Sequence, residues 1–190
     1  STAEEEAVNE ILNATVDPSG LTGTSSISGR VLVQTPFGVI PGANATVVIV
    51  QTGYFFDTGA PVNPYPSISG VHNGTLKVTR PIVVERMYTY ACTGTGGHSE
   101  YVKIWNATGW NVSASWNGYE GDWHIITFDK PFILEANKTY YYTIKTGSYP
   151  QIHHTDELEA DGGIIKCQEF VDANGKVYYN WIPAIRFEGK

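Results

Sequence analysis

The chain has 190 residues, a formal net charge of −7, 16% charged residues and 13% aromatic residues, among them 12 Tyr and 5 Trp. The negative charge and the lack of a basic patch argue against a nucleic acid or an anionic membrane as partner. No apolar run approaches the roughly 20 residues of a membrane-spanning helix. The low charge and the many aromatic residues suit half-buried pleated surfaces and predict an all-β protein.

Residues 1–20 differ in composition from the rest of the chain. Glutamates at positions 4–6 and 10 surround apolar residues at positions 7, 8, 11 and 12, and the segment ends at Asp17-Pro18-Ser19-Gly20, which predicts a short helix or an acidic N-terminal arm. Two alternatives stay open, a frayed, locally helical end and an arm that docks on a neighbouring subunit. The chain starts at Ser1 rather than Met, as expected after removal of a leader or for a piece of a longer protein.

Residues 21–190 are predicted to form a β-sandwich or jelly roll of about eleven short strands, with 21–70 and 71–190 as alternative sub-units of one fold. Runs at 27–33 and 42–50 read as two strands joined by a turn at 36–38, and the Gly- and Pro-rich stretch 51–74 is predicted to be a long loop. Residues 140–145 alternate between a buried and a solvated face. Further strand-like runs follow at 75–79, 82–91, 100–106, 110–116, 123–129, 139–146, 164–170, 176–181 and 184–187.

Glycosylation sequons and two cysteines indicate an exported protein. Cys92 and Cys167 are far apart in sequence, and a disulfide between them would close a long loop and stabilise the fold by about 2–4 kcal/mol. The sequons exceed the roughly two expected by chance and predict N-linked glycans in an extracellular or cell-surface location. The six acceptors are Asn13, Asn44, Asn73, Asn106, Asn111 and Asn137.

Two parts of the chain resemble known families. Ile27-Ser28-Gly29-Arg30-Val31 and the run from Ile40 to Val47 are similar to the opening of carboxypeptidase regulatory-like β-sandwich domains, over residues 27–50. The pattern GSYPxIHH at 147–154, followed by VDANGKxYxxWIPAI at 171–185, resembles a module repeated in archaeal secreted and cell-surface proteins. This resemblance implies an archaeal envelope or extracellular product, and archaea glycosylate the same sequon on surface proteins. It implies no particular activity.

A polar run beginning at His153 and His154 is the candidate metal site. With Asp156 it offers imidazole and carboxylate ligands for zinc or calcium. Neighbouring strand residues point to opposite faces, so both histidines could share an ion only from a loop. The alternative is a polar loop with one hydrogen-bonded and one exposed histidine, and apart from N-linked glycans no cofactor is expected.

Aromatic residues concentrate between residues 105 and 123. Exposed aromatic rings on a jelly roll can stack on pyranose rings, although tryptophans in sandwiches are commonly part of the core. Glycans at Asn106 and Asn111 would crowd such a binding face. The candidate stacking residues are Trp110, Trp116, Tyr119 and Trp123.

Catalysis is not expected. Glu120 and Asp122 are candidates for hydrolysis by two carboxylates, but any acidic β protein offers a similar pair. The sequence has no Gly-x-Ser-x-Gly elbow, no His-Glu-x-x-His helix and no phosphate-binding glycine loop.

The function predicted first is a structural subunit of an extracellular, glycosylated archaeal filament or surface layer. Copies of the chain would assemble through the N-terminal arm and open sheet edges. The alternatives are a carbohydrate-binding module that uses exposed Trp and Tyr residues, and a metal-dependent hydrolase.

Overall fold

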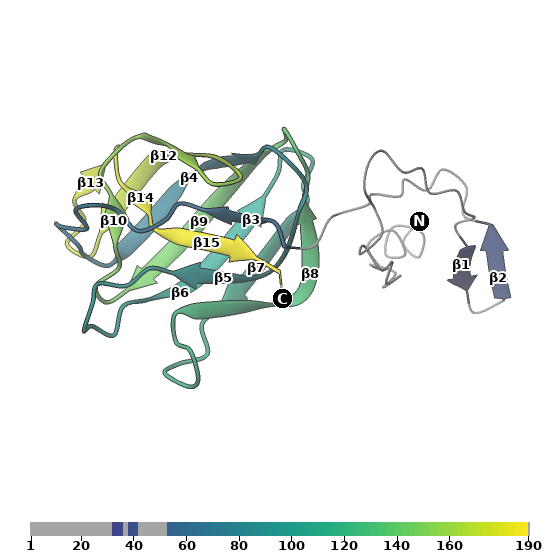
Figure 1. Ribbon diagram of the computed structural model, residues 1–190, viewed down its shortest axis with the longest axis horizontal. Helices are drawn as coiled ribbons and strands as arrows, with labels where there is room; N and C mark the ends of the chain where they lie inside the picture. Colours follow the sequence, from purple (N-terminus) through teal and green to yellow (C-terminus); the bar gives the residue numbers. More distant parts are fainter. Residues whose placement is uncertain (1–31, 36–37, 42–52, 190) are drawn as a thin grey trace. The chain divides into compact units, whose positions relative to one another are not determined.

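The computed structural model describes residues 32–35, 38–41 and 53–189, and the chain divides into two compact units, Ser1–Ile49 and Val50–Lys190 (Figure 1). In the first unit, β1 (Leu32–Thr35) and β2 (Gly38–Pro41) form an antiparallel hairpin in which Thr35 pairs with Gly38. The arm or helix predicted for residues 1–20 lies outside the described residues. The predicted boundaries, 1–20 and 21–190, therefore stay predictions.

The second unit is a sandwich of two antiparallel sheets, which confirms the all-β fold class. Within the described part of the chain there are fifteen strands and no helix, so none long and apolar enough to cross a membrane. The seven-stranded sheet contains, in spatial order, β11 (Glu157–Ala160), β12 (Gly163–Asp172), β4 (Gly70–Val78), β9 (Thr139–Gly147), β6 (His98–Trp105) and β7 (Asn111–Ser115), with β13 (Val177–Tyr178) also paired to β12. The four-stranded sheet contains β3 (Phe55–Asp57), β15 (Ile185–Glu188), β5 (Ile82–Thr89) and β8 (Ile125–Leu134), and β10 (Ile152–His153) pairs with β14 (Ile182–Pro183).

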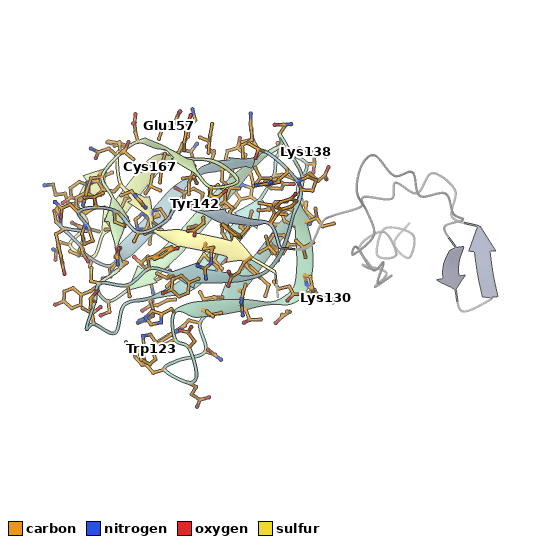
Figure 2. The ribbon with its side chains drawn as sticks, viewed as in Figure 1. Trp123, Lys130, Lys138, Tyr142, Glu157 and Cys167 are labelled. Atoms are coloured by element: carbon orange, nitrogen blue, oxygen red, sulfur yellow. The ribbon has the colours of Figure 1, made fainter. Side chains whose placement is uncertain are left out.

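The core lies between the two sheets, where the period-2 pattern of each strand directs its apolar residues. In β9, Tyr140, Tyr142 and Ile144 are buried, as the alternation predicts, while Tyr141 and Thr143 face outward. Tyr142 is labelled in the interior in Figure 2, and its hydroxyl donates a hydrogen bond to the Lys166 carbonyl oxygen, 3.0 Å away. This hydrogen bond links β9 to β12 across β4 in the same sheet, while the apolar side chains of β9 pack in the core between the two sheets.

The long loop predicted for residues 51–74 is wrong at both ends. Phe56 is fully buried in the short strand β3, and β4 already begins at Gly70. A Cβ at Gly70 would collide with the Val171 carbonyl oxygen and the Phe170 ring, so only glycine allows the two strands to approach here. The loop proper runs from 58 to 69 and contains a cis peptide bond between Tyr65 and Pro66.

The strand predicted at 123–129 extends further than expected. As β8 it continues to Leu134, although Pro131 lies within it. The register between β5 and β8 shifts between Val84 and Arg86, so the two strands resume pairing beyond a bulge. A bulge tolerates proline because the ladder hydrogen bond is already lost there.

Candidate functional site

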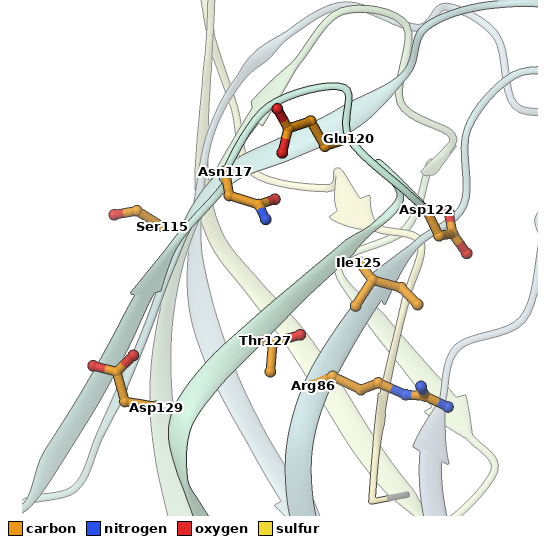
Figure 3. Close-up of a pocket in the computed structure, with 8 residues that line it drawn as sticks. All are labelled: Arg86, Ser115, Asn117, Glu120, Asp122, Ile125, Thr127 and Asp129. Carbon is orange, nitrogen blue, oxygen red and sulfur yellow. The ribbon is translucent and has the colours of Figure 1, made fainter.

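An open pocket of about 480 Å³ lies where β5, β7, β8 and the loop between β7 and β8 meet (Figure 3). Arg86 of β5 pairs with Thr127 of β8 and Tyr88 pairs with Ile125, so the outward side chains of these strands form one wall. The remaining lining residues are Ser115 of β7, Asp129 of β8, and Asn117, Glu120 and Asp122 of the loop.

Most hydrogen-bonding side chains in the pocket have no partner among the described residues. Asp122 is held in place, because its Oδ1 accepts hydrogen bonds from the His124 backbone N–H at 3.1 Å and from Nδ1 at 2.7 Å. Arg86 is engaged outside the pocket, where its Nε donates to Glu188 Oε1 at 2.8 Å. Glu120 and Asp129 make no hydrogen bond or ion pair with the described chain. The predicted pair Glu120 and Asp122 therefore does line one site, with Asp129 as a third carboxylate.

A polar network on the outer face of the four-stranded sheet fixes Arg86. Glu188 accepts hydrogen bonds from Nε of both Arg86 and Arg186. Beyond them, the Tyr90 hydroxyl lies 2.9 Å from both carboxylate oxygens of Asp57, and burial together with this hydrogen bond raises the pKa of Tyr90 to about 12. The contact with Glu188 restrains the Arg86 side chain, which lines the pocket.

The predicted stacking residues do not form one exposed platform. Trp110 packs on the core rings Phe132 and Tyr140, with centroids 5.5 and 5.8 Å away. Trp116 is half-buried and stacks on the ring of His98, with the ring centroids 3.7 Å apart. Exposure is therefore concentrated elsewhere in the cluster.

Tyr119 is the exposed member of the aromatic cluster, with 60% of its surface accessible. Its ring stands edge-on to Trp116 at 4.7 Å. Trp116 Nε1 donates a hydrogen bond to the Trp123 carbonyl oxygen at 2.9 Å, which ties the start of the loop to its end. This loop carries Glu120 and Asp122 of the pocket lining, so the contacts of the aromatic cluster restrain the segment that presents them.

The histidine candidates for metal binding have separate contacts. His153 Nε2 lies 2.9 Å from the Gly59 carbonyl oxygen, and burial lowers the pKa of this histidine. His154 instead places its ring edge-on to Trp181 at 4.6 Å. Across residues 53–189, no three His, Cys, Asp or Glu side chains are grouped in a way that could hold a metal ion, Asp156 included.

The sequons differ in exposure. Asn13 and Asn44 lie outside the described residues. Asn111 and Asn137 are exposed, and Asn137 adopts a positive φ of 60° in the turn between β8 and β9. Asn73 is different, because it lies within β4 and its Oδ1 accepts a hydrogen bond from Thr143 Oγ1 at 2.6 Å.

Asn106 begins the turn between β6 and β7. Its Oδ1 accepts hydrogen bonds from the backbone N–H and the hydroxyl of Thr108, at 3.1 and 2.7 Å. The sequon threonine therefore contacts its own asparagine at an exposed turn.

The predicted disulfide between Cys92 and Cys167 is wrong, because both cysteines are free. Cys92 is buried in the loop after β5, where its Sγ contacts the Pro150 carbonyl oxygen at 3.7 Å. Cys167 lies in β12 opposite Gly74, and partial burial raises the pKa of its thiol. Distance along the sequence carries no information on whether two Cβ atoms come close enough to be bridged.

Alkylation of the protein unfolded without reductant is expected to modify both cysteines. Mass spectrometry should find two labels per chain, and reduction beforehand should add none. A chain that takes no label until it is reduced would contradict the free-thiol state.

These observations define the class of protein, an all-β sandwich with an open, acidic surface pocket. No family model matches the chain, and no curated protein or solved structure is significantly similar to it.

Proposed function

We propose that this chain is a structural subunit of an extracellular filament or surface layer built from copies of itself. The observation that carries the proposal is a group of exposed tyrosines, Tyr65, Tyr119 and Tyr149, which we call the tyrosine end. They are 56%, 60% and 58% accessible. Exposed tyrosines are typical of protein interfaces, since the ring adds apolar contact area at a low entropic cost.

Contacts between loops bring the three tyrosines to one end of the sandwich. The Cys92 backbone N–H donates to the Tyr149 carbonyl oxygen at 3.1 Å, and Cys92 Sγ lies 3.5 Å from Ser67 Oγ, two residues after Tyr65. The Tyr119 hydroxyl donates to the Gly96 carbonyl oxygen at 3.3 Å, in the same loop as Cys92. The tyrosine end therefore spans four loops.

The accessible sequons lie at the opposite end. Because neighbouring strands are antiparallel, the turns after β6 and β8 lie away from the loops after β5, β7 and β9. These turns carry Asn106 and Asn137, and Asn111 opens β7 beside the first of them. The chain also enters the sandwich and leaves it at this sequon end, because Phe55 pairs with Glu188 (Figure 1). Glycans on these three sequons would therefore leave the tyrosine end uncovered.

This polarity supports a head-to-tail arrangement. A contact between two different surfaces propagates into a filament unless its rotation closes a ring. In the proposal, the predicted N-terminal arm adds to an open sheet edge of the next copy. β7 offers one such edge, since within the described residues it pairs only with β6 and exposes Asn111, Ser113 and Ser115. The resemblance to archaeal surface proteins supports the proposed location.

Assembly of the full chain tests the proposal. Electron microscopy and sedimentation of the wild type are expected to reveal filaments or sheets. Replacing Tyr65 and Tyr149 together by serine should raise the concentration needed for assembly at least about tenfold, because interface aromatics contribute strongly when they are buried.

A matched control is Phe55→Ser, which removes an aromatic ring that is 38% exposed at the sequon end. If it stays folded, as judged by thermal unfolding, it should assemble like the wild type. A wild type that is monomeric at every concentration, or a tyrosine variant that assembles normally, would overturn the proposal.

A further inference from the structure

The pocket between β5, β7 and β8 is suited to a ligand that supplies many hydroxyl groups. Asn117, Glu120 and Asp129 line the pocket, and their polar groups have no partner among the described residues (Figure 3). Ser115 and Thr127 add two hydroxyls. A volume of about 480 Å³ falls within the usual range of small-molecule sites. The site therefore has the size and the free donors and acceptors for a polar molecule.

The charge of the pocket selects among polar ligands. Three carboxylates line it, and the one guanidinium, on Arg86, is already paired with Glu188. The uncompensated negative charge disfavours phosphates, sulfates and uronic acids. Carboxylates accept strong charge-assisted hydrogen bonds from hydroxyl groups, which a neutral sugar offers in neighbouring pairs.

The surroundings of the pocket also favour a sugar over an apolar ligand. Ile125 is the one apolar residue in the lining, and the other seven side chains carry polar groups. Tyr119, which lies between two lining residues in the sequence, does not line the pocket, and its ring packs against Trp116 and His98 instead. The lining therefore favours the hydroxyl groups of a sugar and offers no aromatic ring for its C–H face.

We propose that this pocket binds a neutral saccharide through the side chains of Asn117, Glu120, Asp122 and Asp129. Two sources share this chemistry, a free polysaccharide outside the cell and a sugar of an N-linked glycan on a second copy of the chain. The second source rests on the proposed head-to-tail assembly, in which the sequon end of one copy meets the pocket side of the next.

Saccharide binding is measured on full-length, unglycosylated chain, first on an array of neutral, acidic and amino sugars and then by calorimetry. Tryptophan fluorescence gives a second readout, since Trp116 and Trp123 lie in or beside the pocket loop. A neutral oligosaccharide is expected to bind, and the double variant Glu120→Gln with Asp129→Asn should weaken it at least about tenfold. The matched control is Glu159→Gln, an exposed acid on β11 that does not line the pocket.

Binding of no neutral saccharide, equal binding of uronic acids, or unchanged affinity in the double variant would each overturn the proposal. Competition identifies the source. If glycosylated chain displaces the bound saccharide and deglycosylated chain does not, the natural ligand is an N-linked glycan. If the two forms compete equally, the natural ligand is a free polysaccharide. The Tyr65 and Tyr149 double variant should retain saccharide binding, so failure of the assembly proposal is seen separately.

Discussion

Replacing Gly74 by alanine is expected to lower the free energy of unfolding by about 3 kcal/mol or more, because the added methyl group has no space. Gly74 lies in the middle of β4, between Tyr142 of β9 and Cys167 of β12. A Cβ here would collide with the Lys166 carbonyl oxygen and with the Tyr142 ring and hydroxyl. The ring of Tyr142 covers the glycine, so relief of the clash would displace a fully buried side chain.

Urea unfolding of both proteins measures this effect. The matched control is Thr75→Ala in the same strand, where the side chain is half-buried on the outer face and the expected loss is under about 1 kcal/mol. Tyr142→Phe is expected to cost about 1 kcal/mol, the usual value of one hydrogen bond, here to the Lys166 carbonyl oxygen. If Gly74→Ala proved as stable as the wild type, the close packing of β4, β9 and β12 would be contradicted.

The sheets could be predicted where strands are long and alternate. Residues 140–145 identify both faces of β9, because a period of two needs only a few residues to become clear. β3 is too short to show any period, although its Phe56 is fully buried. The start of β4 could not be predicted for a different reason. Gly70 and Gly74 are typical of loops, whereas here they allow neighbouring strands to approach closely.

The pocket could be predicted only in part. Glu120 and Asp122 stand out because they are close in sequence to two tryptophans, and both line the pocket. Arg86 and Asp129 belong to strands that the sequence does not connect, and a bulge beside Arg86 changes the register between them. Between the pairs Val84–Phe132 and Arg86–Thr127 one β5 residue lies opposite four β8 residues, and the hydrophobic pattern of neither strand reveals this mismatch.

The polarity of the sandwich connects the two proposals. Up-and-down connections place alternate loops at alternate ends, so residues 65, 119 and 149 come together although they are distant in sequence. The loop that carries Tyr119 supplies three lining residues of the pocket, so the pocket reaches the tyrosine end, although its Ser115 shares the exposed face of β7 with the sequon residue Asn111.

Acid is expected to weaken the fold through His72. This side chain is fully buried in β4, stacks on Phe170 at 4.1 Å and places Nδ1 3.2 Å from the Trp181 carbonyl oxygen, while Nε2 has no partner. Burial lowers its pKa to about 3, and the hydrogen bond to Trp181 opposes this only in part. In the unfolded chain His72 binds a proton below pH ~6.5, whereas in the folded chain it stays neutral down to about pH 3. The free energy of unfolding therefore decreases as the pH falls through this window.

The slope of this loss is at most about 1.4 kcal/mol per pH unit, so roughly 2–3 kcal/mol should disappear between pH 7 and pH 4.5. His72→Phe keeps an aromatic ring against Phe170 and removes the titrating group. Urea unfolding at both pH values should therefore give a smaller difference for this variant, with a residual slope from His153 and His154, whose pKa values burial also lowers. Thr75→Ala, which removes no titrating group, should keep the full difference of the wild type. If the wild type and His72→Phe lost the same free energy of unfolding between the two pH values, the loss would come from other titrating groups and the prediction would be contradicted.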